Sequence, residues 1–400
     1  MHIFEQLGVN TVVNAVGPAT RLGGPRMLPE VVDAMAEAAS SCVAIDALQA
    51  AASARIADAT GCEAGFVTAG SAAGLTMATA ACLARLDPGR MESLPDTSGM
   101  PNEVIICRDQ RSGYDHAVRA AGAMLVEVGM NEVVSGAGSR RTEAWEISQA
   151  IGERTAAIVY FATPWSEPAL EDVIEVSARH NVPLIVDAAG QLPPASNLYR
   201  YGSSGADAVV FSGGKAIRGP QGTGVLAGRR ELIMSVALQC LDLDEHPDTW
   251  DPPELLINRS AIAGMPRHGI GRGFKVSKEE IVGLLVALEQ FRSNDLEGEH
   301  AMHTARLGRV HAAVQGLTGV HPHRVEPDED QGYPLLEIRL DPGGPAGSAV
   351  NVAQRLRHQS PPIYIAEHKL WEDVIVIHPV ALSDEDVDML IDGLLQLLSI

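Results

Sequence analysis

The middle of the chain alternates short apolar runs with helix-length segments, and this alternation constrains the fold more than any other feature. Apolar runs at 156–161, 183–187 and 208–211 are separated by a helical pattern at 168–180 and by a proline-rich loop. Strands that alternate with helix-length segments form right-handed crossovers and a mostly parallel sheet covered on both faces. The sequence therefore predicts an α/β domain whose ligands bind beyond the carboxyl ends of the strands.

Similar patterns extend to both sides of this region. Toward the N-terminus they predict helices at 29–40 and 45–60, a strand at 65–68, a helix at 75–86, strands at 103–107 and 124–128, a Gly/Ser-rich loop at 135–140 and a helix at 143–151. Toward the C-terminus they predict a strand at 225–228, helices at 229–239, 277–291, 296–316, 348–358 and 383–398, and strands at 320–326, 334–340, 362–366 and 373–377. Ser277 and Glu280 have the spacing of a helix capping box. We expect an N-terminal arm (1–25), a large α/β domain (26–290) and a small C-terminal α+β domain (291–400).

The composition argues against several classes of function. The 400 residues include 30 basic and 51 acidic side chains, a formal net charge of −21, which argues against a nucleic-acid partner. The sequence has no apolar run long enough to span a membrane, and its five cysteines have no CxxC spacing. The pairs His300/His303 and His321/His323 lack a third ligand at an obvious spacing, so we interpret them as surface polar groups. We therefore expect a cytoplasmic protein that acts on a small molecule, without a metal ion or a membrane.

Lys215 stands in an unusual setting, a glycine-rich turn between two short apolar runs. A surface loop usually surrounds its lysine with other polar residues, whereas the glycines of residues 211–224 let backbone pack closely around this one. A lysine held in this way is a candidate to carry pyridoxal 5'-phosphate (PLP) as a Schiff base.

The neighbouring strand ends supply the other groups that PLP needs. The cofactor requires an amine, an anionic partner that keeps its pyridine nitrogen protonated, and donors for its phosphate. Asp187 ends the strand before the lysine strand, and Ser212 directly precedes the glycine-rich turn. The small residues at 70–72 begin a helix, where free N–H groups and the positive dipole end attract an anion, although small residues also serve helix–sheet packing. Together these features predict PLP as the cofactor.

Several motifs between residues 10 and 290 carry a resemblance to a known family. They are Asn14-Ala15 with Gly23-Gly24, the run from Thr68 to Gly74, Asp187-Ala188-Ala189 with Leu192-Pro193-Pro194, Ser212-Gly213-Gly214-Lys215 through Gly219-Pro220-Gln221, and Gly271-Arg272 with Lys275-Val276 and Lys278-Glu279-Glu280. On these motifs the chain resembles the fold-type I PLP enzymes of the selenocysteine synthase (seryl-tRNA selenium transferase) group. Within that group it is similar to the branch that contains D-glucosaminate-type ammonia-lyases.

The resemblance implies an aspartate-aminotransferase-like fold and a homodimer or higher homo-oligomer, in which the N-terminal arm helps to build the neighbour's site. It implies that Lys215 forms the Schiff base and shuttles protons, that Asp187 contacts the pyridine nitrogen, and that Gln110 lies near the ring face. The cofactor-binding residues expected from the motifs and the resemblance together are Gly70, Ser71, Ala72, Gln110, Asp187, Ser212 and Lys215.

The expected reaction is an α,β-elimination, in which a small hydroxylated amino acid or amino-sugar acid gives a 2-oxo acid and ammonia. The arm begins close to residue 1 and the chain is acidic, so we favour such a substrate over a tRNA. A guanidinium from Arg272 or Arg218 is expected at the substrate carboxylate, and Asn14 and Thr20 of the arm are expected at the substrate as well. Racemisation, aldol cleavage, transamination, β-replacement and a non-catalytic regulator remain open alternatives.

Overall fold

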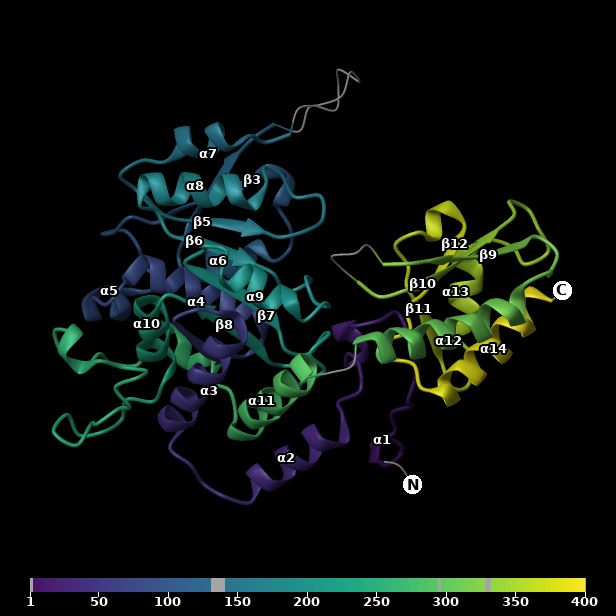
Figure 1. The fold of residues 1–400 in the computed structure, drawn as a ribbon, viewed down its shortest axis with the longest axis horizontal. Coiled ribbons are helices and arrows are strands. Elements are labelled where there is room, and N and C mark those ends of the chain that lie inside the picture. The colour runs from purple at the N-terminus through teal and green to yellow at the C-terminus, as the bar shows by residue number, and fades with distance from the viewer. Residues whose placement is uncertain (1–2, 131–140, 294–295, 328–331, 400) are drawn as a thin grey trace. The chain divides into compact units, whose positions relative to one another are not determined.

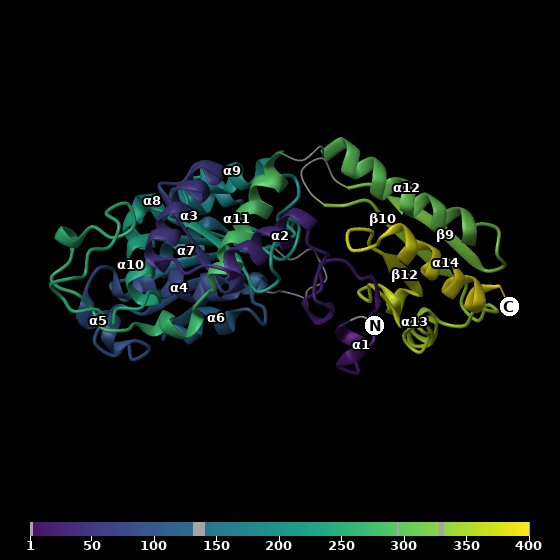
Figure 2. The ribbon, with the colours of Figure 1, turned by 90° about the horizontal axis from the view of Figure 1, so that it is seen from below.

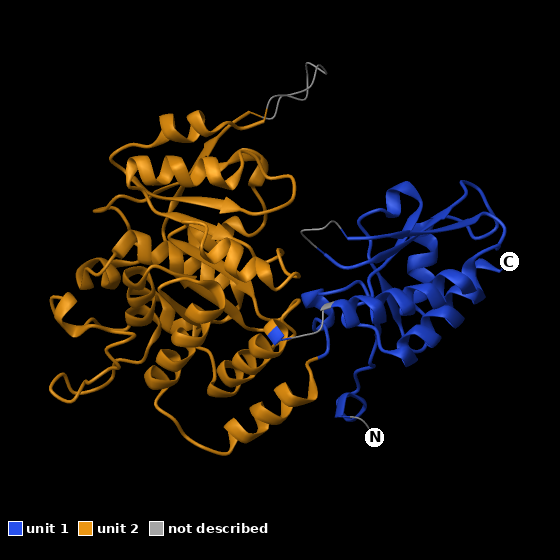
Figure 3. Ribbon diagram, viewed as in Figure 1, with its two compact units in different colours: residues 1–26, 293–400 blue, residues 27–292 orange. Residues whose placement is uncertain are grey.

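The computed structural model (Figure 1, Figure 2) describes residues 3–130, 141–293, 296–327 and 332–399. The chain divides into two compact units (Figure 3). The larger unit contains residues 27–292, and the smaller unit contains residues 1–26 together with 293–400. Among the described residues, none of the helices combines the length and the apolar character that crossing a membrane requires.

A central sheet built from seven strands of the described chain organises the larger unit. In spatial order the strands are β2 (Ala64–Thr68), β8 (Gly224–Gly228), β7 (Ala208–Ser212), β6 (Leu184–Asp187), β5 (Thr155–Phe161), β3 (Glu103–Cys107) and β4 (Met124–Val128). β8 runs antiparallel to both of its neighbours, and the other pairs are parallel. The inner strands are almost wholly apolar and buried, as a sheet covered on both faces requires. The predicted mostly parallel sheet is confirmed.

Helices cover both faces of this sheet (Figure 2). On one face lie α3 (Ile45–Thr60), α8 (Leu170–His180) and α9 (Ser196–Gly202), and on the other lie α4 (Gly70–Ala84), α5 (Pro88–Ser93) and α6 (Asp115–Ala120). Every residue of α4 from Ala73 onward is buried, because the helix packs between the sheet and α10 (Arg230–Cys240). The remaining helical segments of this unit are α2 (Pro29–Ala39), α7 (Ala144–Ala150), α11 (Lys278–Ser293), η2 (Arg108–Gln110), η3 (Arg259–Ala261) and η4 (Ile270–Phe274).

The smaller unit has a core of its own, formed by strands and helices from both ends of the chain. Its three-stranded antiparallel sheet has the order β12 (Val374–Ile377), β10 (Leu335–Leu340) and β9 (Val320–Val325). Its helices are α1 (Ile3–Gln6), α12 (Leu296–Val314), α13 (Ala349–Arg357) and α14 (Asp384–Leu398), with the short turns η1 (Thr20–Leu22) and η5 (Leu370–Glu372). Strand β1 (Val13–Ala15) pairs in parallel with β11 (Ile363–Ile365), so the N-terminal segment forms part of this unit.

Local sequence signals account for many of the boundaries. β3 and β4 have the predicted bounds, and the predicted capping box starts α11, where Ser277 Oγ accepts the N–H of Glu280 at 3.2 Å while the Glu280 carboxylate accepts the N–H of Ser277 at 3.1 Å. Two predictions are wrong in part. α4 begins at Gly70 rather than residue 75, and α9 occupies part of the segment predicted as a proline-rich loop. The predicted loop at 135–140 lies outside the described residues.

Candidate active site

The pairing of the strands brings the predicted functional groups to one edge of the sheet. Gly224, the first residue of β8, pairs with Thr68 at the end of β2 and with Ser212 at the end of β7. Asp187, the last residue of β6, pairs with Phe161 of β5 and with Val210 of β7. Since the carboxyl ends of parallel strands share an edge, the start of α4, Asp187 and the loop after β7 all lie there.

The loop that carries Lys215 is closed by backbone hydrogen bonds. The N–H of Gly213 donates to Thr223 O at 2.9 Å, and the N–H of Gly219 donates back to Gly213 O at 2.9 Å. A Cβ atom on Gly214 would lie 2.6 Å from Gln221 Cα, so a side chain there would collide with backbone. The glycines therefore allow the tight loop that fixes Lys215 beside the sheet edge.

Lys215 and Asp187 are half-buried and interact electrostatically. Burial lowers the pKa of the Lys215 ammonium, and the nearby Asp187 carboxylate offsets part of this effect. Burial raises the pKa of Asp187, while the N–H of Ala189, 2.9 Å from Oδ1, and the charge of Lys215 act in the opposite direction. At a given pH, the neutral fraction of the Lys215 amine is therefore larger than that of an exposed lysine, which favours its use as a nucleophile.

The start of α4 forms an open anion-binding position next to this pair. Gly70 has a φ of +88°, and Ala69, at the N-cap position, makes no side-chain cap hydrogen bond. Ala72 is exposed, and Gly70 and Ser71 are half-buried. The backbone N–H groups and the positive end of a helix of fifteen residues are thus accessible to a phosphate group.

Close backbone packing between β8 and the start of α4 supports this anion-binding position. A Cβ atom on Gly224 would lie 2.7 Å from Ser71 N and 2.8 Å from Gly70 O, so β8 and the start of α4 touch directly. Sequence reasoning did not identify Gly224 as a site residue, although the Gly-Thr-Gly run that ends the lysine loop was a signal of close backbone approach. The residues at this edge therefore fit PLP, because they offer an amine, a carboxylate and a helix N-terminus held together by residues without side-chain bulk.

Gln110 and Arg218 are held in place by different contacts. The buried Gln110 side chain accepts the N–H of Phe161 at 3.0 Å and donates to Glu167 O at 3.2 Å, so it braces two backbone segments near Asp187. Arg218 has a left-handed backbone with a φ of +59°, and its N–H donates to Lys215 O at 3.1 Å. Arg218 thus helps to fix the loop through its backbone, whatever its side chain contacts.

Comparisons with known proteins agree with this geometry. The aminotransferase class-V family matches residues 130–240, which include Asp187 and Lys215. The solved structure of a D-glucosaminate-6-phosphate ammonia-lyase superimposes with a TM-score of 0.81 at 28% identity, covering 99% of this chain and 98% of that one. The chain is a PLP-dependent enzyme with the type I fold, similar to members of the selenocysteine synthase-like group.

Two curated relatives match this chain over almost its entire length, and another matches part of it. D-glucosaminate-6-phosphate ammonia lyase from Salmonella typhimurium is 28% identical, with 98% of this chain and 96% of the relative covered. A 5'-C-glycyluridine monooxygenase-decarboxylase from a Streptomyces species is 29% identical, with 99% and 92% covered. An L-seryl-tRNA(Sec) selenium transferase from Mannheimia succiniciproducens is 27% identical over 40% of this chain and 38% of its own length. The predicted fold and cofactor and the predicted resemblance to this group are confirmed.

We expect Gly224→Ala to weaken the binding of PLP by this enzyme about tenfold, because the added methyl group pushes the start of α4 away from β8. The same clash should lower the free energy of unfolding by about 1–3 kcal/mol. PLP titration and urea unfolding measure the two effects. Gly152→Ala is the matched control, because no atom lies within 4 Å of its Cβ position. If Gly224→Ala is less stable but binds PLP as tightly as the wild type, the contact between β8 and the start of α4 does not shape the phosphate position.

Arg272, the first sequence candidate for the substrate carboxylate, is paired within the larger unit. Its Nη2 atom lies 2.7 Å from Asp242 Oδ2, and this pairing holds the pKa of Asp242 below its usual range. His268 also contacts Asp242, at 3.1 Å, and the exposed groups of Asp242, Asp244 and His268 lie within 4.8 Å of one another. The Arg272 guanidinium already pairs with Asp242, so a substrate carboxylate that binds Arg272 would compete with Asp242.

The predicted substrate residues of the N-terminal segment belong to the smaller unit. Asn14 is buried in β1, donates to Gly17 O at 3.0 Å and accepts the N–H of Val16 at 3.0 Å, so its amide shapes the turn that follows the strand. Thr20 is exposed at the start of η1. The substrate roles of Asn14 and Thr20 stay predictions.

The interpretation of His303 as a surface group is wrong. Its side chain is only 2% exposed, because it occupies the face of α12 that also buries Leu307, Val310 and Val314. Its ring lies edge-on to Tyr333, with the ring centroids 5.5 Å apart. His300, His321 and His323 are exposed, as expected for surface polar groups.

Proposed function

We propose that the enzyme is a lyase that catalyses the α,β-elimination of a small hydroxylated amino acid or amino-sugar acid. The half-buried pair of Lys215 and Asp187 beside the open start of α4 carries this proposal. Full-length similarity to an enzyme named as an ammonia lyase supports the reaction class. The overall change removes the β-hydroxyl group as water, and a later uptake of water releases ammonia and leaves a 2-oxo acid.

Each residue at the sheet edge has a role that follows from its position. When bound, PLP acts as an electron sink for negative charge at the substrate Cα. The N–H groups of residues 70–72 and the Ser212 hydroxyl would hold its phosphate, and the Asp187 carboxylate would keep its ring nitrogen protonated. Burial lowers the pKa of Lys215, which increases the neutral fraction of its amine and so suits Nζ to act as a base at the substrate Cα.

Proton transfer at Lys215 Nζ would connect the two halves of the elimination. The neutral amine can accept the proton from the substrate Cα, and the resulting ammonium can donate a proton to the departing β-hydroxyl group. Both transfers need the amine to stay close to the substrate, which the closed loop with its Gly213–Thr223 and Gly219–Gly213 hydrogen bonds provides.

A screen for products tests this function. The purified enzyme with PLP is mixed with D- and L-forms of hydroxylated amino acids and amino-sugar acids, with and without a terminal phosphate. We expect ammonia and a 2-oxo acid in equal amounts from at least one compound, and no ammonia from its 3-deoxy analogue. Recovery of the inverted amino acid without ammonia would replace the lyase by a racemase.

The similarity to a monooxygenase-decarboxylase favours one second candidate. In that reaction an amino acid would lose carbon dioxide with consumption of molecular oxygen, and the same lysine and aspartate would bind the cofactor. Measuring oxygen uptake and carbon dioxide release in the same screen separates the two candidates, because elimination requires neither. The homo-oligomeric state and the cytoplasmic location stay predictions from the sequence.

A further inference from the structure

A cavity of about 210 Å³ lies in the larger unit, at the amino ends of β6 and β7. Its wall includes Asp207, which directly precedes β7, Arg229, which follows β8, and Arg85, which follows α4. Asp187 and Ser212 end the same two strands at the opposite edge of the sheet, and the five residues of β7 span roughly 13 Å. The cavity is therefore separate from the candidate active site, and its volume suits a small ion or metabolite.

Arg85 stands at a backbone position that glycine usually occupies. It caps the end of α4 with a φ of +54°, a left-handed value that costs conformational energy for a residue with a side chain. The backbone is fixed there, because the N–H of Arg85 donates to Ala81 O at 2.8 Å and its carbonyl accepts the hydroxyl of Ser235. A glycine would fit this turn with less strain, so the presence of arginine points to a role for its side chain.

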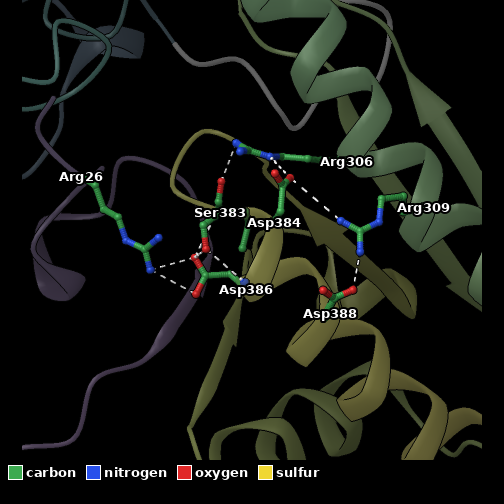
Figure 4. Close-up of polar contacts among 8 residues, drawn as sticks. Arg26, Arg306, Arg309, Ser383, Asp384, Asp386 and Asp388 are labelled. Atoms are coloured by element: carbon green, nitrogen blue, oxygen red, sulfur yellow. Dashed lines mark hydrogen bonds and ion pairs between the residues drawn. The ribbon is translucent and has the colours of Figure 1, made fainter. Parts of the chain in front are cut away.

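The Arg85 guanidinium lacks an acceptor of its own. Across the described ranges of the chain, this half-buried side chain makes no hydrogen bond and no ion pair. Figure 4 shows the usual arrangement in the smaller unit, where Arg306 and Arg309 of α12 pair with carboxylates of α14. Burial of part of a guanidinium without an acceptor is unfavourable, so Arg85 is suited to a ligand that supplies one.

The acidic side chain in the cavity wall is already engaged. Asp207 Oδ1 accepts a hydrogen bond from Nη1 of Arg229 at 3.0 Å, and Oδ2 accepts the N–H of Leu184 at 2.8 Å. The Nη2 atom of Arg229 is 3.9 Å from the exposed Glu231 carboxylate, which is beyond hydrogen-bond distance and outside the cavity wall. Among the described residues, Arg229 therefore keeps donors without an acceptor, while both oxygens of Asp207 are occupied and neither bonds to Arg85.

The charges of these groups converge on the end of α4. Burial raises the pKa of the Cys82 thiol to about 12, while the charges of Arg85 and Arg229 act to lower it and that of Asp207 acts to raise it. Because electrostatic interactions weaken with distance, a response to all three charges indicates that they lie close to one another. Glu63 also interacts with Arg229 but does not line the cavity. Two guanidinium groups thus meet one carboxylate in the cavity wall.

The end of α8 offers an alternative role for Arg85, because the negative end of a helix attracts cations. This helix closes its own carbonyls. Asn181 has a left-handed φ of +52° and its N–H donates to Ala178 O at 3.3 Å, while the N–H of Val182 donates to Ser177 O at 3.1 Å. Arg85 is therefore not needed as a donor to these carbonyls, although an electrostatic contribution to α8 has to be distinguished by experiment.

We propose that this cavity binds the phosphate group of a small ligand between the guanidinium groups of Arg85 and Arg229. A guanidinium presents a planar fork of donors that matches phosphate oxygens, and a doubly charged anion gains from two such groups. The side-chain amide of Asn181, exposed at the cavity, adds a donor. Inorganic phosphate and the phosphate ester of a metabolite share this chemistry, so the experiment compares them. The site does not rest on the proposed function, because it uses none of the residues around Lys215.

Calorimetric titration of the PLP-loaded enzyme tests the site. Reduction with borohydride first attaches the cofactor covalently, so that its own phosphate fills the position at the start of α4. The probes are inorganic phosphate, glycerol 3-phosphate and acetate at constant ionic strength. We expect both phosphates to bind more tightly than acetate, and Arg85→Gln to weaken their binding about tenfold or more. Tighter binding of glycerol 3-phosphate would assign the site to a phosphate ester, and tighter binding of inorganic phosphate would assign it to the free anion.

Two further variants show whether the loss is specific to the cavity. Arg55→Gln is the matched control, because Arg55 is exposed on α3 and its replacement removes the same charge outside the cavity. Arg85→Lys keeps the charge but loses the planar fork, so it should recover only part of the affinity. Equal phosphate affinity of Arg85→Gln and the wild type would overturn the proposal, and so would equal losses in Arg85→Gln and Arg55→Gln.

Urea unfolding separates ligand binding from a structural role of Arg85. Arg85→Gly suits the φ of +54° and removes the guanidinium. The wild type should gain stability when phosphate replaces chloride, because a ligand that binds the folded state stabilises it, and Arg85→Gly should lose most of this gain. An Arg85→Gly variant that kept the full gain would overturn the proposal and leave Arg85 with a structural role at α8. None of these measurements uses turnover, so they do not depend on whether the enzyme proves to be a lyase.

Discussion

Lys215→Ala is expected to remove the visible absorption band of the PLP-loaded protein and to lower turnover by about 10³-fold or more. The reason is that one amine both attaches the cofactor and moves the substrate proton, so its removal affects two steps. Absorption spectra, with and without borohydride, and ammonia release measure the two effects. Lys369→Ala is the control, since Lys369 lies in the smaller unit and pairs with Glu337.

The pH dependence of cofactor uptake provides a second measurement of the same residue. Burial lowers the pKa of Lys215, so its neutral fraction at any given pH exceeds that of an ordinary lysine. The rate at which the cofactor-free protein takes up PLP should therefore rise with pH and level off below the ordinary pKa of lysine. A Lys215→Ala variant that kept the wild-type band and turnover would contradict the assignment of this residue.

Apolar runs and parallel connectivity made the central sheet predictable, whereas short helices depended on tertiary contacts. α9 follows a proline-rich segment and contains two tyrosines and a glycine, which are weak helix formers. It is helical because the side chains of Leu198 and Tyr201 are buried in the core of the larger unit. The early start of α4 also depends on tertiary packing, since Gly74 lies close to the sheet and a Cβ atom there would lie 3.1 Å from Val210 Cγ1.

The candidate site was predictable where it depended on strand ends. Asp187 and Lys215 follow strands whose carboxyl ends share an edge, and this rule needs only the order of elements. Contacts between distant segments gave no local signal. The sequence could not reveal that β8 lies between β2 and β7 and places Gly224 against the start of α4. It also could not reveal that Arg272 pairs with Asp242, because both lie in irregular segments.

The N-terminal segment illustrates the same limit. β1 pairs with β11, and almost the entire chain separates these two strands in sequence. The motifs near residue 14 therefore predict an arm that contains Asn14 and Thr20, but they do not connect Arg21 with Tyr364 and Glu367. The contacts of Arg21 depend on the pairing of these two distant strands, which local sequence does not indicate.

Asp187→Asn is expected to lower turnover by about 10²-fold or more while the visible band of bound PLP remains. The amide has nearly the same shape as the carboxylate and can still accept the N–H of Ala189, which lies 2.9 Å from Oδ1. It carries no negative charge, so it cannot hold a proton on the pyridine nitrogen, and the cofactor becomes a weaker electron sink. Asp172→Asn on the exposed surface of α8 is the matched control.

The pH dependence of PLP affinity tests whether the charge of Asp187 is responsible. Burial raises the pKa of this carboxyl group, so it becomes protonated at a higher pH than an ordinary aspartate. Wild-type affinity should therefore fall as the pH decreases through this raised pKa, because the protonated carboxyl group no longer attracts the positive ring nitrogen. Asp187→Asn should lack this decrease, since its amide does not titrate. If the asparagine variant retained both the wild-type turnover and the acid-side loss of PLP affinity, another group would have to protonate the cofactor.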